Sequence, residues 1–247
     1  MPSFDIIKKV EPDETFRVKS IIGAFDLDLS HIDEHFKGNI DIENKDWNIG
    51  LIVGGSGTGK STIAKECFDE SYFTKYEYKA KSVIDDMSEG KTIKEIEQTF
   101  TNVGFSSPPC WLKPYHVLSN GEKMRVDLAR CILDDKEIIC FDEFTSVVNR
   151  EVAKTTSYAI SKAIRRLNKK FVAISCHDDI IDWLEPDWIY NTDTKSFFGL
   201  AVNTKDRQLN LKYTKLTQNI KTKFGNYLES IIIWTRNCTK VHNNMLE

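Results

Sequence analysis

The sequence lacks the features that identify several classes of protein. Its 247 residues contain no run near the roughly 18 apolar residues of a membrane-spanning helix, and no signal-peptide core near the N-terminus. Net charge is only −3, so charge alone does not draw the whole chain to nucleic acid or to a membrane. Internal repeats and coiled-coil heptads are also absent. These absences favour a cytoplasmic globular protein without direct membrane insertion, long enough for one α/β domain with an extension.

Cysteine is sparse and is not arranged for metal or disulfide chemistry. The six cysteines include no Cys-x-x-Cys pair, which disfavours zinc sites and disulfide frameworks. Cys140 and Cys176 each lie in an apolar run. Since unpaired cysteines are among the most buried residues in proteins, we expect buried, reduced thiols.

What the sequence does contain is a complete phosphate-binding loop after an apolar segment, residues 49–53, and before a helical pattern. Its glycines let the backbone turn N–H groups toward phosphates, and the helix N-terminus adds a positive field. Lys60 is predicted to bridge the β- and γ-phosphates, and the Ser61 hydroxyl to ligate Mg²⁺. The predicted nucleotide-binding residues here are Gly54, Gly55, Ser56, Gly57, Thr58, Gly59, Lys60, Ser61 and Thr62.

A second motif is an apolar segment, residues 138–141, that ends in Asp142 and Glu143. Carboxylates at the end of a strand beside a phosphate loop suit a Walker B site. Asp142 would then hold Mg²⁺ and Glu143 would polarise the attacking water. A strand that simply ends in solvated acids is the alternative, and this motif alone leaves it open.

The order of elements predicts the fold class. Helices over 121–133 and 150–168 alternate with apolar strands over 137–141 and 171–175. Such alternation indicates a largely parallel sheet with both faces covered.

Other segments carry weaker patterns. Residues 17–29 and 39–42 are predicted as strands of an antiparallel layer, and residues 76–84 as a further strand. Thr92 followed by Glu95 predicts a capping box at the start of a helix over 92–102.

Residues 118–125, Leu-Ser-Asn-Gly-Glu-Lys-Met-Arg, resemble the LSGGQxxR signature of ABC-type ATPases. Residues 145–149 resemble the D-loop of that family, and His177 stands where its switch histidine is found. The resemblance covers roughly residues 15–199. It implies an α/β P-loop NTPase of the ABC type, with a mostly parallel central sheet, an antiparallel N-terminal layer and a helical subdomain.

The same resemblance implies a composite active site. In the family, two subunits dock head to tail, and the signature of one closes the phosphate site of the other. Ser119, Asn120 and Gly121 would contact the partner's γ-phosphate, while Glu143 and His177 would act in hydrolysis. The expected activity is ATP hydrolysis by an ATP-dependent homodimer, with ATP and Mg²⁺ bound.

The chain departs from the family pattern at several positions. Asn120 replaces a glycine, although asparagine tolerates the left-handed conformation. Glu122 replaces the signature glutamine, and Asn149 replaces the D-loop aspartate. The short segment between Lys60 and the signature predicts a reduced helical subdomain, about residues 85–133.

Two family features have no single candidate. Asp85 or Asp86 could substitute for the Q-loop glutamine, whereas Gln98 fits an exposed helix position. The adenine-stacking aromatic could be Phe25, Phe36 or Trp47, and each is as readily explained as a core residue.

Three functions remain in competition. The sequence resembles small soluble ABC-type ATPases of bacteria and phages, some fused to an acetyltransferase-like domain, which favours a switch acting on a protein or nucleic-acid partner. The alternatives are the ATP-binding subunit of a transporter and a dimer clamp with little turnover. Residues 1–199 are predicted as the ATPase domain and residues 200–247 as an extension. The basic residues of the extension are dispersed, which favours a solvated surface over a nucleic-acid site.

Overall fold

The computed structural model describes residues 3–9, 12–27, 33–73, 75–134 and 136–199. Met1–Gly199 form one compact unit. The predicted extension, residues 200–247, lies outside the described residues, so its separation from the ATPase domain stays a prediction. In the described ranges, no helix has the length and apolar character needed to cross a membrane.

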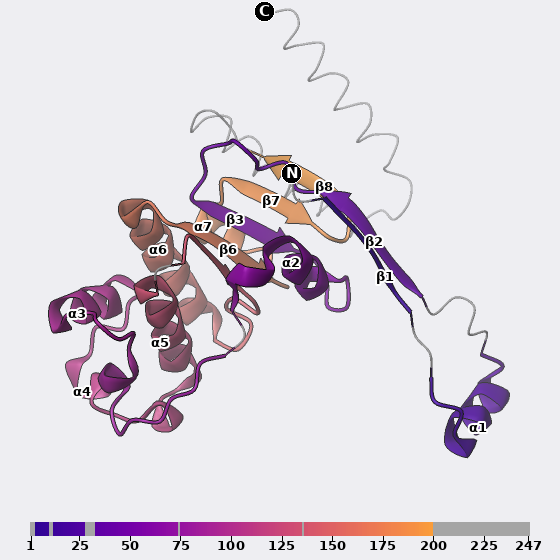
Figure 1. Cartoon of the computed structure of the whole chain (residues 1–247), viewed down its shortest axis with the longest axis horizontal. Coiled ribbons are helices and arrows are strands. Elements are labelled where there is room, and N and C mark those ends of the chain that lie inside the picture. The colour runs from indigo at the N-terminus through magenta and orange to yellow at the C-terminus, as the bar shows by residue number, and fades with distance from the viewer. Residues whose placement is uncertain (1–2, 10–11, 28–32, 74, 135, 200–247) are drawn as a thin grey trace, which may run out of the picture. The chain divides into compact units, whose positions relative to one another are not determined.

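A six-stranded sheet forms the centre of this unit, in the order β4-β5-β6-β3-β7-β8. Figure 1 labels β6, β3, β7 and β8 of this sheet. Neighbouring strands are parallel except for the last, β8, which is antiparallel to β7. All residues of β3 are buried, so both faces of the sheet are covered there. The strands are β3 (Ile49–Val53), β4 (Tyr72–Phe73), β5 (Ile138–Phe141), β6 (Lys170–Ser175), β7 (Trp188–Asn191) and β8 (Ser196–Gly199). The predicted mostly parallel sheet is confirmed.

Parallel pairing brings the C-terminal ends of the strands, which the predicted site residues follow, to one edge of the sheet. Val53 of β3 pairs with Ser175 of β6 and with Asn191 of β7. Phe141 of β5 pairs with Ala173, two residues before the end of β6. The residues that follow β3, β5 and β6 therefore converge.

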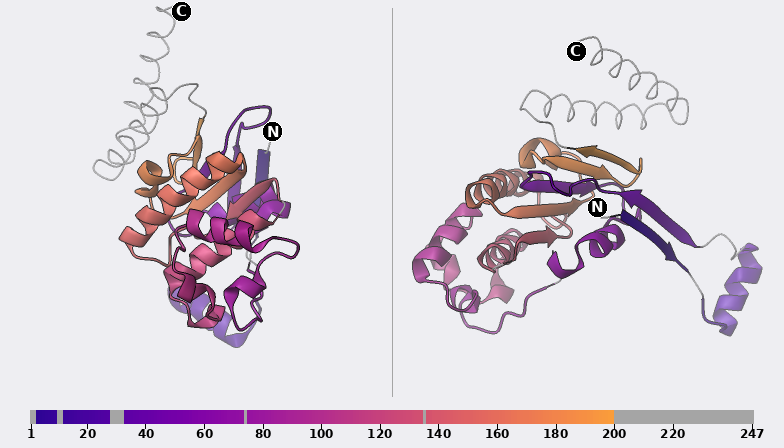
Figure 2. Two further views of the ribbon diagram at one scale, coloured as in Figure 1. Left: turned by 90° about the vertical axis from the view of Figure 1, so that its left-hand side faces the viewer. Right: turned by 45° about the horizontal axis from the view of Figure 1, so that its top comes forward.

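Helices cover the sheet and build a smaller helical region. Both α2 (Lys60–Phe68) and α6 (Arg150–Leu167) contact β3, and α6 also contacts α7 (Ile180–Leu184). In the helical region, α3 (Ile93–Asn102) packs against α5 (Asn120–Leu133) and against α6 (Figure 2). Four short helical segments complete the path, namely η2 (Asp69–Ser71), η3 (Val83–Asp86), α4 (Pro108–Trp111) and η4 (Tyr115–Val117).

The predicted capping box of α3 is present. The Thr92 hydroxyl accepts the Glu95 N–H, and the Glu95 carboxylate accepts the Thr92 N–H at 2.8 Å. Further along α3, Phe100 is fully buried and packs edge-on against Phe105 and at a tilt against Trp111. A local aromatic core therefore supports this small helical region.

The antiparallel N-terminal layer exists, but its strands differ from those predicted. It consists of β1 (Ser3–Lys8) and β2 (Glu34–Asn39). The strand expected over 17–29 is instead a helix, α1 (Phe16–Phe25). Thr15 caps this helix by accepting the Val18 N–H, and apolar residues recur at helical spacing along it. The strand prediction overlooked both signals.

The strand expected over 76–84 is also absent from the described structure, where η3 occupies the end of that range. Side chains, rather than a strand ladder, hold this segment. The Tyr78 hydroxyl donates to Asp127 on α5 at 2.7 Å, and the Tyr76 hydroxyl donates to Asp134. Tyr76 and Tyr78 alternate with polar residues, as in a strand, because both side chains point to the same partner, α5.

The cysteine prediction holds in part. The described cysteines, Cys67, Cys110, Cys131, Cys140 and Cys176, are all free. Burial raises the pKa of the Cys67 thiol to about 11 and that of Cys131 to about 12. Cys176 is exposed rather than buried, because it lies just beyond the end of β6.

Candidate functional site

The phosphate loop joins the end of β3 to the start of α2. Gly57 and Gly59 have φ angles of +80° and +83°, a left-handed conformation that favours glycine. A Cβ on Gly59 would also lie 2.2 Å from the ring of Phe36. No side chain caps the N-terminus of α2, so its first N–H groups point out as a site for anions.

A cavity of about 410 Å³ lies over this loop. The loop contributes Ser56, Gly57, Gly59, Lys60, Ser61 and Thr62 to its lining. From the end of β5 come Asp142 and Glu143. The structure thus brings the predicted metal ligands, Ser61 and Asp142, into one cavity with the predicted catalytic Glu143. Gly54, Gly55 and Thr58 do not line it, and the Lys60 ammonium donates to the Gly55 carbonyl at 2.5 Å.

Tyr72 on β4 is a residue of this site that the sequence analysis missed. Its hydroxyl donates to the Asp142 carboxylate and accepts the Ser61 hydroxyl. Burial, followed by the neighbouring Asp142, raises the pKa of Tyr72, so the hydroxyl keeps its proton. Hydroxyl and carboxylate oxygens are the ligands that Mg²⁺ prefers. No sequence motif marks Tyr72, and only the pairing of β4 with β5 places it beside the Walker B residues.

Glu143 adopts an unusual backbone conformation. Its φ is +50°, which is strained for a residue with a side chain, and such strain clusters at functional sites. The turn is held by hydrogen bonds from Glu143 N–H to the Asp142 carboxylate at 2.8 Å and from Ser146 N–H to the Glu143 carbonyl at 2.9 Å. The exposed Glu143 side chain therefore projects from a fixed turn.

The signature residues lie elsewhere, at the start of α5. Ser119 is the N-cap, and the Glu122 carboxylate accepts both the Ser119 N–H at 2.8 Å and its hydroxyl at 2.7 Å. These hydrogen bonds hold the pKa of Glu122 below its usual value. Asn120 is the first residue of the helix, so the left-handed conformation considered for it is not used. Ser119 and Asn120 are exposed, and neither lines the phosphate cavity, nor does Gly121.

Two further motif residues have local roles. Asn149 caps α6 by accepting the Val152 N–H at 2.9 Å. His177 follows β6 and is half-buried, and its N–H donates to the Ser175 hydroxyl at 3.2 Å. Ser175 and Cys176 line the phosphate cavity, but His177 does not.

The candidates for the Q-loop residue are used in local turns. Asp86 accepts the N–H groups of Lys79 and Ala80, and Asp85 accepts the Ser82 hydroxyl. Neither aspartate lines the phosphate cavity. Gln98 lies on α3, as expected for a helix residue.

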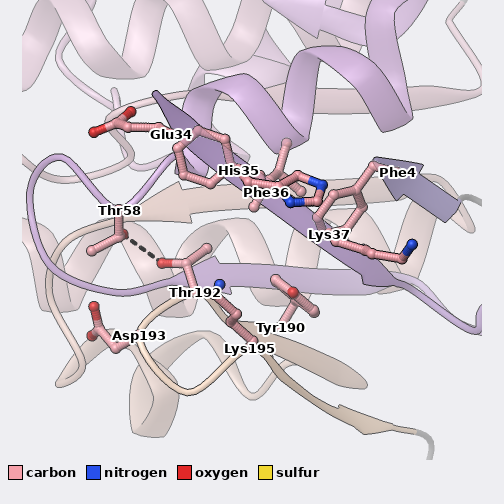
Figure 3. Close-up of a pocket in the computed structure, with 11 residues that line it drawn as sticks. Phe4, Glu34, His35, Phe36, Lys37, Thr58, Tyr190, Thr192, Asp193 and Lys195 are labelled. Carbon is pink, nitrogen blue, oxygen red and sulfur yellow. Dashed lines mark hydrogen bonds between the residues drawn. The ribbon is translucent and has the colours of Figure 1, made fainter. Parts of the chain in front are cut away.

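The three adenine-stacking candidates have different surroundings. Trp47 is buried and packs edge-on against Trp188, so it belongs to the core. Phe25 is 69% exposed on α1. Of the three, Phe36 alone contacts the phosphate loop, at Gly59, and it also lines a second cavity beside that loop (Figure 3).

Comparison with solved structures identifies the fold. The chain is similar to the dimeric ATP-binding cassette MJ0796 bound to ADP and Pi, with 15% identity and a TM-score of 0.52 over 65% of this chain and 88% of that one. It is also similar to cbiO1 from Clostridium perfringens, part of the ABC transporter complex cbiONQ. That match has 16% identity and a TM-score of 0.55, over 77% of this chain and 88% of that one. The predicted ABC-type P-loop fold is confirmed.

A sequence model of the ATPase family associated with various cellular activities (AAA) matches residues 50–182. The match runs from the strand before the phosphate loop to α7, so it includes the loop, the signature, the Walker B carboxylates and His177. It spans more than half of the 247 residues. The chain therefore belongs to the ATPase family associated with various cellular activities, and its ABC-type domain binds and hydrolyses ATP.

Proposed function

We propose that this ATPase binds Mg-ATP, docks head to tail with a second copy of itself and uses hydrolysis to switch the conformation of a protein or nucleic-acid partner. One observation carries the proposal. The phosphate cavity gathers Lys60, Ser61, Asp142 and Glu143, but the chain's own Ser119 lies outside it. A second copy would supply the missing signature.

Each residue has a role that its surroundings support. Lys60 and the α2 N-terminus would bind the phosphates. Ser61 and Asp142 would hold Mg²⁺, which when bound neutralises phosphate charge. Glu143 would orient and deprotonate the attacking water.

From the second copy, Ser119 and the backbone of Asn120 and Gly121 would donate to the γ-phosphate. The exposure of the signature and its position at the N-terminus of a 14-residue helix support this role. The dimeric state of the similar cassette MJ0796 also supports it. His177 would reach the γ-phosphate once the nucleotide and the second copy are in place.

A transporter subunit is the second candidate, because cbiO1, one of the similar structures, is part of an ABC transporter complex. Two observations favour a role outside transport. Among the described residues, no glutamine that could serve as the Q-loop residue lines the phosphate cavity, and Tyr72 contacts Asp142 there instead. The segment that follows is held to Asp134, the C-cap of α5, through Tyr76 and to Asp127 on α5 through Tyr78, whereas a loop that transmits motion to a membrane partner would need to move.

The test is the size of the Glu143→Gln protein in solution. Mg-ATP should convert it from monomer to dimer, because the γ-phosphate is retained between the two copies. The double variant Glu143→Gln/Ser119→Arg should stay monomeric while still binding ATP. If Glu143→Gln remains a monomer at saturating Mg-ATP, the composite-site proposal fails.

The trapped dimer also separates the candidate partners. We expect a pull-down with Glu143→Gln and ATP to retain a specific partner that the ATP-free protein does not retain. Binding of nucleic acid should weaken steeply with salt, whereas binding of a protein need not. Membrane transport components in the pull-down would support the second candidate. A wild-type hydrolysis rate no higher than that of Glu143→Gln would instead indicate a clamp.

A further inference from the structure

The phosphate loop is held from outside its cavity by the turn between β7 and β8. The Gly55 N–H donates to both carboxylate oxygens of Asp193, at 3.0 and 3.1 Å. The hydroxyls of Thr58 and Thr192 are hydrogen-bonded, with their oxygens 2.6 Å apart. Figure 3 draws this bond as a dashed line. We call these contacts of Thr192 and Asp193 the outer brace.

The turn that carries the outer brace is itself fixed. The buried Asn191 side chain accepts the N–H groups of Asp193 at 2.9 Å and Thr194 at 3.1 Å. The Thr192 N–H donates to the Val53 carbonyl at 2.8 Å, at the last residue of β3. The turn is therefore anchored to the strand from which the phosphate loop starts.

The approach between turn and loop is close enough to constrain the loop sequence. A Cβ on Gly54 would lie 2.1 Å from the Thr192 hydroxyl oxygen. Within the loop, the Thr58 hydroxyl also donates to the Gly55 carbonyl at 2.9 Å. The outer brace thus fixes both Gly55 and Thr58, which flank residues 56–57 in the lining of the phosphate cavity.

The outer brace faces a different cavity from the phosphates. Thr58, Thr192 and Asp193 line a cavity of about 420 Å³, together with Phe36 (Figure 3). None of these four residues lines the phosphate cavity. A carboxylate here can order the loop without occupying the positions of the phosphate oxygens.

We propose that Asp193 is a positioning residue for ATP, which holds the phosphate loop in its binding conformation through the Gly55 N–H. Order present before binding reduces the entropy lost on binding, so the brace strengthens ATP affinity. Its negative charge acts in the opposite direction, because the ligand is a polyanion. The inference rests on ATP binding by a single chain and not on the dimer or its partner.

The two effects separate in a pair of variants. Asp193→Ala removes the acceptor and the charge, and should weaken binding of a fluorescent ATP analogue by about 5-fold, the net value of one ordinary hydrogen bond, because losing the repulsive charge offsets part of the cost. Asp193→Asn keeps an acceptor oxygen without the charge, and should bind at least as tightly as wild type, most clearly at low salt. Hydrogen exchange in residues 54–60 should quicken in Asp193→Ala alone.

Two controls keep the test decisive. Glu137→Ala removes an exposed carboxylate paired with Lys170 on β6, and should change neither ATP affinity nor loop exchange. Thr192→Val removes the second contact of the brace while keeping the side-chain shape, and should give a smaller loss than Asp193→Ala. Wild-type affinity and loop exchange in a folded Asp193→Ala protein would overturn the proposal. Equal losses in Asp193→Ala and Asp193→Asn would overturn it too.

Discussion

The two loops that would complete one ATP site are held in contrasting ways. The phosphate loop is fixed from 138 residues away in sequence, by Asp193 on the Gly55 N–H. The signature loop is fixed from three residues away, by Glu122 on Ser119. The phosphate loop is therefore shaped by the folded domain, whereas the signature loop is shaped by its own helix cap.

The difference extends to the groups that would meet phosphate. In the phosphate loop, the external carboxylate binds a backbone N–H outside the cavity, which leaves Ser61 facing Asp142 within it. In the signature, the Glu122 carboxylate accepts the Ser119 hydroxyl itself. Ser119 must leave this partner before it can donate to a γ-phosphate. The external carboxylate therefore does not engage the Ser61 hydroxyl of the phosphate loop, whereas the signature carboxylate occupies the Ser119 hydroxyl.

The largest expected effect separates the two loops by where they act. Lys60→Ala should weaken ATP binding to the single chain by at least about 100-fold, because it removes a charge-assisted contact with the phosphates. Ser119→Ala should leave that binding unchanged and weaken only the ATP-dependent dimer. Titration of a fluorescent ATP analogue and sedimentation in the Glu143→Gln background measure the two quantities. If Ser119→Ala also weakened ATP binding to the single chain, the two loops would not have the separate roles proposed here.

The next largest effect is expected at Tyr72, beside the predicted metal ligands of the phosphate cavity. Tyr72→Phe removes the hydroxyl that orients Asp142 and Ser61, and should reduce the Mg²⁺-dependent gain in ATP affinity by about 10-fold. Affinity measured with EDTA should not change. Tyr115→Phe is the matched control, since its hydroxyl contacts Asp127 on α5 at 2.8 Å. If the Mg²⁺-dependent gain in ATP affinity were the same in Tyr72→Phe and Tyr115→Phe, Tyr72 would not be part of the metal site.

A smaller and opposite effect is expected on the signature side. Glu122→Gln should tighten the Mg-ATP-dependent dimer of the Glu143→Gln protein by about 5-fold, because an uncharged amide oxygen accepts the Ser119 hydroxyl more weakly and does not repel phosphate. Glutamine still serves in a capping box, so α5 should keep its N-terminus. Glu95→Gln changes the equivalent capping box on α3 and should have no effect on the dimer. A weaker dimer in Glu122→Gln would instead make the carboxylate a favourable part of the site.

The same contrast explains which parts of the protein were predictable from sequence. Local signals identified the phosphate loop, the capping box at Thr92 and the helix after Ser119. The apolar segments that became β3, β5 and β6 also predicted the parallel sheet. The strand expected over 17–29 failed because its helical cap at Thr15 was overlooked.

Contacts between distant segments were not predictable in the same way. Asp193 and Tyr72 belong to no motif, and only the strand order places them beside Gly55 and Asp142. Cys176 was expected to be buried because its neighbours are apolar, but the end of β6 leaves it exposed. The function of such residues depends on register and turn geometry, which a single sequence does not encode locally.

The smallest expected effect is on the stability of the fold at acid pH, through the carboxylate of Glu122. Ser119 hydrogen bonds lower the pKa of Glu122 below its ordinary value of 4.5, so its ionised form stabilises the folded chain above that value. This stabilisation should be lost as the pH falls through the lowered pKa. The melting temperature of wild type should therefore exceed that of Glu122→Ala at pH 7, and the two should converge in acid. In a Ser119→Ala background, adding Glu122→Ala should lower the melting temperature at pH 7 much less. A gap between wild type and Glu122→Ala that persists in acid would show that the cap does not depend on the carboxylate charge. The restraint on Ser119 would then need another cause.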